Sequence, residues 1–268
     1  MAAAVYLEER RSKSAAWSWR LASFSAVLFI IAALSHRYSL LETVPFLWVL
    51  GIVAVLAAFA LICAAFALPS VWSNGDMGGK DMTYGAVLAC FVLVPFLLSG
   101  YRAFVYPELN DISTDLDDPP ALTVALKTRT SGMNPVVAPS PAQAKLQTEK
   151  YPDITGRRYD LPLDRTLSAV EAVLSHTDWK LYGPMRSPDN TDEIRIEALA
   201  YTTFLAFPED VSIRLLDEGD TTYVDMRSAS RYGRHDLGDN AARVRQFLND
   251  LDTEIADETG QQPLPDAE

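Results

Sequence analysis

Three long apolar runs, separated by short polar segments, dominate the first 104 residues of the chain. They predict helices over about residues 17–35, 44–68 and 84–104, and the apolar stretches themselves, residues 21–34, 44–68 and 84–101, contain no charged side chain. A helix needs about 20 consecutive, predominantly apolar residues to span the hydrocarbon core of a bilayer. The pattern therefore predicts that residues 1–104 form a membrane domain of three transmembrane helices, the second of which should end at Pro69.

Two other interpretations of these runs fit the residues less well. A cleavable signal peptide would leave a small-x-small cleavage site after the first run, and the sequence has no clean one there. A transport pathway would place an ionisable side chain inside a span, and the interiors of the runs lack one. We therefore interpret the runs as an uncharged three-helix anchor.

The distribution of Lys and Arg predicts how this anchor is oriented. One side of the predicted spans has five such residues and the other has two: Arg10, Arg11, Lys13, Arg20 and Lys80 against Arg37 and Arg102. Because cytoplasmic segments carry the excess of Lys and Arg, the N-terminus is expected in the cytoplasm. Three spans then place the C-terminal domain outside. In a bacterium this describes a multi-pass protein of the inner (cell) membrane with a periplasmic domain.

The residues after 104 carry the patterns of a globular domain. Residues 105–153 are polar and rich in Pro, and we interpret them as an extended linker followed by a Pro-rich loop. Residues 154–257 place several strand patterns between two helix patterns, and residues 258–268 are expected to form a disordered tail. This order predicts an α+β soluble domain, an antiparallel sheet with helices on one face, attached to three N-terminal transmembrane α-helices. Its core should hold Ile194, Ile196, Ala198, Ala200, Val244, Phe247 or Leu248, Leu251 and Ile255, closed by Phe204 and Phe207.

The clearest hairpin joins residues 211–216 to residues 221–230 through the turn Asp217–Asp220. If Asp217 pairs with Asp220, the register places Ile213 opposite Val224, Val211 opposite Met226 and Arg214 opposite Tyr223. The side chains at 211, 213, 224 and 226 then face the core, and those at 228 and 230 continue that face. The side chains at 225, 227 and 231 point the other way.

Composition excludes several classes of partner. The chain carries a net charge of −12, and the residues from Val105 onward hold 16 Lys and Arg against 30 Asp and Glu. Contacts with phosphates need a basic face, so nucleic acid is not expected as a partner. Cys63 and Cys90 both lie inside apolar runs, and no Cys/His spacing for zinc is present. The sequence therefore predicts neither a metal nor a cofactor.

A group of polar residues between the last strand and the last helix stands out in this acidic domain. Guanidinium groups, serine hydroxyls and the N–H groups of a helix start can together bind phosphate or carboxylate. The candidate ligand-binding residues are Arg227, Ser228, Ser230, Arg231, Arg234, Asp236, Asn240 and Arg243. An internal Arg–Asp network that fixes the strand-to-helix turn is the alternative interpretation of the same residues.

Two chemical alternatives are weaker. Ser228, His235 and Asp236 contain the groups of a hydrolase triad, but adjacent His and Asp side chains cannot readily orient one another, and a G-x-S-x-G elbow is absent. No catalytic residue is therefore assigned. The four aspartates within residues 111–118 suggest calcium, but the spacing lacks the central Gly and closing Glu of an EF-hand loop. Asx-turns and solvation explain these aspartates better.

Two blocks of the soluble half resemble a bacterial and plastid family known as domain-of-unknown-function family number 1499. They are N-D-I-S-T-D with the following D-D-P-P, at Asn110–Pro120, and R-S-x-S-R-x-G-x-x-D-x-G-x-N-x-x-R, at Arg227–Arg243. The resemblance covers roughly residues 109–251. It implies that the two blocks contribute to one shared site, and it brings no activity or cofactor.

Together these observations favour an integral membrane protein whose extracytoplasmic α+β module binds a partner or a small anionic ligand without catalysis. The expected partners are the lipid bilayer and either another envelope protein or a small anion. A membrane-tethered enzyme acting on a cell-envelope substrate is one alternative. A structural subunit of a membrane complex is the other.

Overall fold

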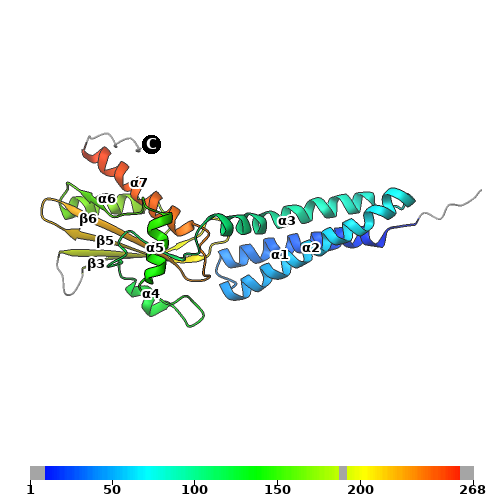
Figure 1. Ribbon diagram of the computed structural model, residues 1–268, viewed down its shortest axis with the longest axis horizontal. Helices are drawn as coiled ribbons and strands as arrows, with labels where there is room; N and C mark the ends of the chain where they lie inside the picture. The colour runs from blue at the N-terminus through cyan, green and yellow to red at the C-terminus, as the bar shows by residue number, and fades with distance from the viewer. Residues whose placement is uncertain (1–9, 187–191, 260–268) are drawn as a thin grey trace, which may run out of the picture. The chain divides into compact units, whose positions relative to one another are not determined.

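The computed structural model describes residues 10–186 and 192–259. It divides into two compact units, Met1–Tyr101 and Arg102–Glu268 (Figure 1). The turn expected at residues 189–190 and the tail beyond residue 259 lie outside the described residues.

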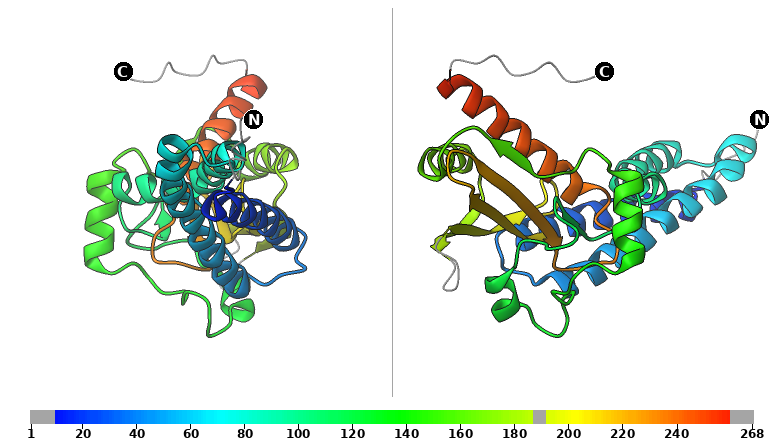
Figure 2. Two further views of the ribbon diagram at one scale, coloured as in Figure 1. Left: turned by 90° about the vertical axis from the view of Figure 1, so that its right-hand side faces the viewer. Right: turned by 60° about the vertical axis from the view of Figure 1, so that its left-hand side comes forward.

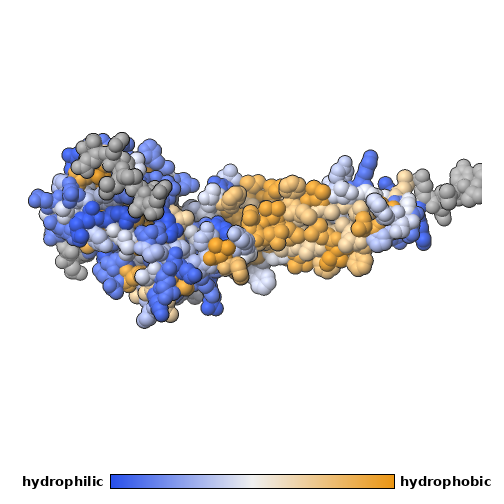
Figure 3. All heavy atoms as spheres, turned by 45° about the horizontal axis from the view of Figure 1, so that its top comes forward, coloured by the Kyte–Doolittle hydropathy of each residue, from blue (hydrophilic) through white to orange (hydrophobic). Residues whose placement is uncertain are grey.

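The first unit consists of helices α1 (Lys13–Arg37), α2 (Thr43–Asn74) and the larger part of α3 (Gly79–Val105). All three are long and apolar enough to cross a membrane, as the sequence predicts. Their outer surfaces are strongly hydrophobic (Figure 3). The end expected at Pro69 is wrong, because α2 continues through this proline to Asn74.

Small residues allow these helices to pack closely. A Cβ atom on Gly85 of α3 would lie 2.4 Å from the hydroxyl oxygen of Ser18 in α1, so the backbones meet where only glycine fits. Four buried alanines contribute to the same interface: Ala22, Ala57, Ala60 and Ala89. Contacts between small residues are typical of helices packed within a bilayer. Burial of apolar area does not favour helix association there, because the lipid tails are themselves apolar.

The second unit is built on a six-stranded antiparallel sheet. Five strands lie in the order β1-β6-β5-β4-β3, and β2 also pairs with β6. The strands are β1 (Asp111–Ser113), β2 (Arg157–Tyr159), β3 (Lys180–Arg186), β4 (Glu193–Tyr201), β5 (Pro208–Asp217) and β6 (Thr222–Ser230). The helices are α4 (Thr123–Thr128), α5 (Pro141–Lys150), α6 (Leu163–Ser175) and α7 (Asp239–Thr259). The predicted α+β class is therefore confirmed.

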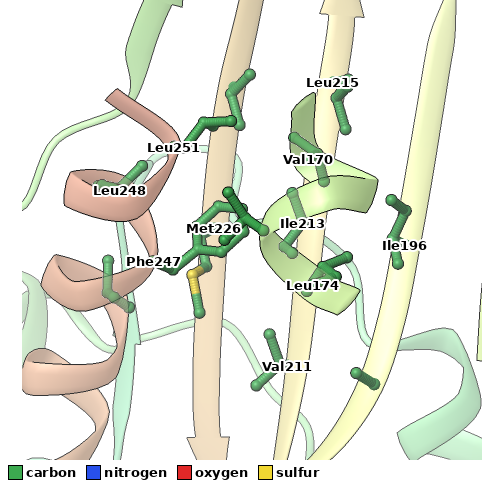
Figure 4. Packing of buried hydrophobic residues seen from close by; sticks show 14 of the residues in the cluster. Val170, Leu174, Ile196, Val211, Ile213, Leu215, Met226, Phe247, Leu248 and Leu251 are labelled. Carbon is green, nitrogen blue, oxygen red and sulfur yellow. The ribbon is translucent and has the colours of Figure 1, made fainter. Parts of the chain in front are cut away.

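Helices α6 and α7 lie along one face of the sheet and form the core with it (Figure 4). Val170 and Leu174 of α6 face the strands, and Phe247, Leu248 and Leu251 of α7 pack beside them. The strands contribute Ile196, Val211, Ile213, Leu215 and Met226 from the same side. Burial of one such side chain stabilises the fold by roughly 1.5–3 kcal/mol, so this face supplies most of the hydrophobic drive.

The register of the β5–β6 hairpin differs from the expected one by two residues. Asp217 pairs with Thr222, which places Ile213 opposite Met226, Val211 opposite Ser228 and Arg214 opposite Asp225. The turn is longer because Gly219, with φ of 87°, adopts a left-handed conformation, and its N–H donates to Oδ1 of Asp217. Side chains alternate between faces with a period of two, so a shift of two residues leaves the predicted core face intact.

Residues 105–153, expected to be a linker and loop, carry β1, α4 and α5. Leu122 and Ala125 pack on Ala229, whose side chain lies on the sheet face opposite α6 and α7. Helix α4 accordingly lies on the far side of the sheet from α7 (Figure 2). Both faces of the central strands are therefore covered. The core position expected for Phe204 is wrong, since this side chain is 92 % exposed.

Candidate functional site

The eight residues predicted to bind a ligand are distributed by the alternation of strand β6 over both faces of the sheet. Arg227 and Arg231 point to the face covered by α4, whereas Ser228 and Ser230 point to the face covered by α7. The side chains therefore do not converge on one point.

On the α4 face, each of the two buried arginines is held by a carboxylate, Arg227 by the partly exposed Asp111 and Arg231 by the buried Asp210. Nε and Nη2 of Arg227 donate to the two carboxylate oxygens of Asp111, at 2.9 and 2.7 Å, and Nη2 also donates to the carbonyl of Val137. Arg231 donates to Asp210 at 2.6 Å. Arg129, which follows α4, donates to the same carboxylate at 2.7 Å. Bidentate bonds of this kind fix geometry as well as neutralising charge.

Three of the four aspartates that suggested calcium form ion pairs with arginines of the sheet. Arg214 pairs with Asp225 at 2.8 Å, with Asp118 at 2.7 Å and with Asp115 at 3.1 Å. Burial raises the pKa of Asp225, although its bonds with Arg214 act in the opposite direction. The N–H of Asp117 donates to Oδ1 of Asp115, which is an Asx-turn. Among the described residues no group of carboxylate, His or Cys ligands could hold a metal ion.

On the α7 face, Ser228, Ser230, Asn240 and Arg243 gather around Glu209, a residue that the sequence analysis missed. Ser228 donates its hydroxyl to Oδ1 of Asn240 at 2.7 Å, and Asn240 donates to the hydroxyl of Ser230 at 2.9 Å. Ser230 donates to Glu209, and Arg243 forms an ion pair with the second carboxylate oxygen. Burial is the largest cause that raises the pKa of Glu209, and the positive charge of Arg243 opposes it.

Asp236 and Arg234 lie in the turn between β6 and α7. The carboxylate of Asp236 accepts from the N–H groups of Gly238 and Asn240, both at 2.9 Å, and so caps the start of α7. Its pKa is raised by burial, against the effect of these two bonds. Arg234 is exposed and pairs with Glu108 at 3.2 Å. Asp236 therefore has a structural role, and Arg234 stands apart from the other candidates.

The arrangement does not assemble a hydrolase triad. The hydroxyl of Ser228 is fully buried and is engaged with Asn240 and Arg243. The ring of His235 contacts the carbonyl oxygens of Ala103 and Tyr106, and its Nδ1 accepts from the N–H of Leu237. A base in that position cannot take a proton from Ser228.

A groove of about 570 Å³ lies beside Arg243, between the end of α6, the end of β4 and the first turns of α7. Its lining combines aromatic rings with polar groups, including Trp179, Tyr201, Phe247, Asp178, Asp250, Gln246 and Arg243. The hydrogen bond from Arg243 to Ser228 and the ion pair with Glu209 hold this guanidinium in place. Concave sites that bind small ligands are commonly lined in this way.

One of the missed residues left a signal in the sequence. Glu209 shares the strand phase of Val211 and Ile213, so an acidic side chain falls on the core face, where a charge needs a partner. The groove could not be recognised from the sequence, because it is formed by three segments that only the tertiary fold brings together. The two blocks shared with family 1499 do meet, since β1 pairs with β6 and Asp111 binds Arg227.

Comparison with known proteins places both blocks within one family model. The chain matches the family described as "Protein of unknown function (DUF1499)" over residues 111–251, more than half of its length. No curated protein and no solved structure matches it. The matched segment begins with β1 and ends within α7, so it includes the arginine network and the Glu209 cluster. The chain therefore belongs to the DUF1499 family, here carrying three N-terminal helices that are long and apolar enough to cross a membrane.

Proposed function

We propose that this chain is a membrane-anchored recognition module that binds a small polar ligand or a partner segment in the groove beside Arg243, without catalysis. The groove carries the proposal, because it is a concave surface that combines aromatic rings with carboxylates, and its Arg243 is already paired with Glu209. The internal network of arginines and aspartates serves as the rigid support on which such a site depends.

The charges around the groove favour a ligand with a positive charge over the anion expected from the sequence. Arg243 is paired with Glu209, and Asp239 at the groove edge is paired with Arg102 at 2.6 Å. Asp178 and Asp250 also line the groove, and neither forms an ion pair with another described residue. An anion would meet uncompensated carboxylates, whereas a cation would meet carboxylates and the faces of aromatic rings.

We place the module on the outer side of a bacterial inner membrane, with the N-terminus in the cytoplasm. The excess of Lys and Arg on the N-terminal side of the predicted spans supports this orientation. Three candidate spans are an odd number, so a cytoplasmic N-terminus implies an extracytoplasmic C-terminal domain.

Thermal denaturation of the full chain in lipid nanodiscs tests the binding proposal. Spermidine should raise the midpoint temperature Tm by mass action, and phosphate at the same concentration and ionic strength should not. The double replacement Asp178→Asn with Asp250→Asn should abolish the shift. Asp220→Asn, which removes an exposed carboxylate at the distant β5–β6 turn, should leave it unchanged.

An increase in Tm with phosphate but not with spermidine would indicate that the ligand is an anion. The absence of any shift with either probe would contradict the groove as a binding site and favour a structural subunit of a membrane complex.

A further inference from the structure

The turn between β4 and β5 exposes Phe204 to a degree unusual for a soluble domain. Its side chain is 92 % exposed, and Tyr201 at the end of β4 is partly exposed as well. An isolated exposed apolar side chain is ordinary, but a group of them on one surface marks an interaction site.

The β4–β5 turn lies at the same end of the sheet as the segment that enters the domain from α3. Tyr201 pairs with Pro208, and Glu209 pairs with Ser230, so the β4–β5 turn and the end of β6 lie at the same end of the sheet. The N–H of Ser230 donates to the carbonyl of Asn110. Thr203 and Asp239 line the same groove, and Asp239 binds Arg102.

The exposed apolar residues of the domain are concentrated at this end. Among the described residues from 102 onward, eight large hydrophobic side chains are exposed, and five of them lie here: Phe104, Val105, Tyr106, Tyr201 and Phe204. Phe104 is 90 % exposed. The concentration is too strong for scattered surface positions and indicates a common apolar environment.

Chain connectivity indicates what that environment is. The candidate span α3 continues to Val105, and β1 begins at Asp111, so only a few residues separate the end of the span from the sheet. The bilayer surface must therefore lie close to residues 102–105. Aromatic side chains are the residues that favour the boundary between headgroups and acyl chains.

We propose that this end of the domain rests on the bilayer surface and that Phe204 inserts among the lipid headgroups. The exposed cations at this end, Arg234 and Arg102, are paired with Glu108 and Asp239. The contact is therefore apolar in origin and does not require anionic lipid. It does not depend on the identity of the groove's ligand, although Tyr201 belongs to both surfaces, and it requires α3 to be a membrane span.

Site-specific fluorescence in nanodiscs tests the contact on the full chain. With Cys63 and Cys90 replaced by Ala, an environment-sensitive NBD label is attached to Phe204→Cys or to the control Asp220→Cys. Strand β5 runs between the two positions and has ten residues, so it separates the two labels by about 34 Å, at about 3.4 Å per residue. Nitroxide groups on lipid headgroups should quench the label at 204 at least about twofold more than the label at 220, since interfacial side chains reach about 5–10 Å into the boundary.

Equal quenching at the two positions would overturn the proposal. A second measurement keeps an aromatic ring at the site, with a photoreactive benzophenone amino acid at 204 or at 220. Lipid adducts at 204 and not at 220 are expected. Adducts with protein in place of lipid would identify a protein partner or a second copy of the chain and would refute the lipid contact, as would the absence of any adduct.

Discussion

Replacement of Asp111 by Asn tests whether the arginines of the second shared block are structural or bind a ligand. Asp111 is the bidentate partner of Arg227, whose side chain is almost completely buried. The Asn side chain has the same shape, but it removes the negative charge and directs an amide group toward the guanidinium. Arg227 would keep at most one neutral hydrogen bond to the amide oxygen, besides its contacts with the carbonyl groups of Pro120 and Val137.

The expected loss of stability follows from the burial of this pair. Removal of one partner from a buried ion pair costs about 3–5 kcal/mol, because the other charge stays buried without compensation. The side chain of Asp111 is 21 % exposed, so water offsets part of this cost and the lower end applies. A loss of about 3 kcal/mol should lower the Tm of a domain of this size by about 6–12 °C.

The assay is thermal unfolding of the full chain in nanodiscs, followed by near-ultraviolet circular dichroism. Arg158 and Glu218 provide the matched control, since they form a bidentate pair of similar geometry, at 2.6 and 2.9 Å, on the exposed surface. Glu218→Gln should leave the Tm unchanged within error, because exposed pairs contribute little. Addition of Arg227→Met to Asp111→Asn should recover part of the loss by removing the orphaned charge.

An unchanged Tm for Asp111→Asn would refute the structural role of this pair. If that variant were also stabilised less by phosphate than the unaltered chain, the anion site expected from the sequence would be restored in its place.

Three further changes test other parts of the fold by the same thermal assay. Ile213→Asp should abolish cooperative unfolding of the domain, because an unpaired carboxylate at a fully buried position costs several kcal/mol, and a normal transition would place residue 213 outside the core. Burial raises the pKa of Glu209 in the folded chain, so its stabilising contribution is present below about pH 4.5 and is lost as the pH rises through the folded-state pKa. The Tm difference between the unaltered chain and Glu209→Gln should therefore fall as the pH is raised. A Tm difference that does not change with pH would contradict this. Gly238→Ala should cost about 1–3 kcal/mol, since φ is 82° and the new Cβ would lie 2.9 Å from the ring of Tyr106, whereas Gly132→Ala in open space should be neutral; equal effects would disprove the close approach.

The fold could be predicted from the sequence wherever periodicity reports burial on one face. The three apolar runs correspond to α1, α2 and α3, and the stripe from Val244 to Ile255 is the buried face of α7. The hairpin register could not be predicted, because the turn length depends on the left-handed conformation of Gly219, and alternation alone does not distinguish shifts of two residues.

Residues 105–153 illustrate a different limit. Their prolines and aspartates favour a loop by local propensity. Asp115 and Asp111, however, form ion pairs with arginines on β5 and β6, which are far away in the sequence. Local patterns cannot reveal such pairs. The polar residues around the end of β6 are adjacent in the sequence, but the alternation of the strand places their side chains on opposite faces of the sheet.

We propose that three apolar helices anchor an α+β domain outside the cytoplasm. Cysteine accessibility in intact spheroplasts tests this most directly, with Asp220→Cys in the domain, Ser73→Cys near the end of α2 and the native cysteines replaced by Ala. A membrane-impermeant maleimide should label position 220 before lysis and position 73 only after lysis. Labelling in the reverse order, or release of the chain into the soluble fraction, would contradict the account.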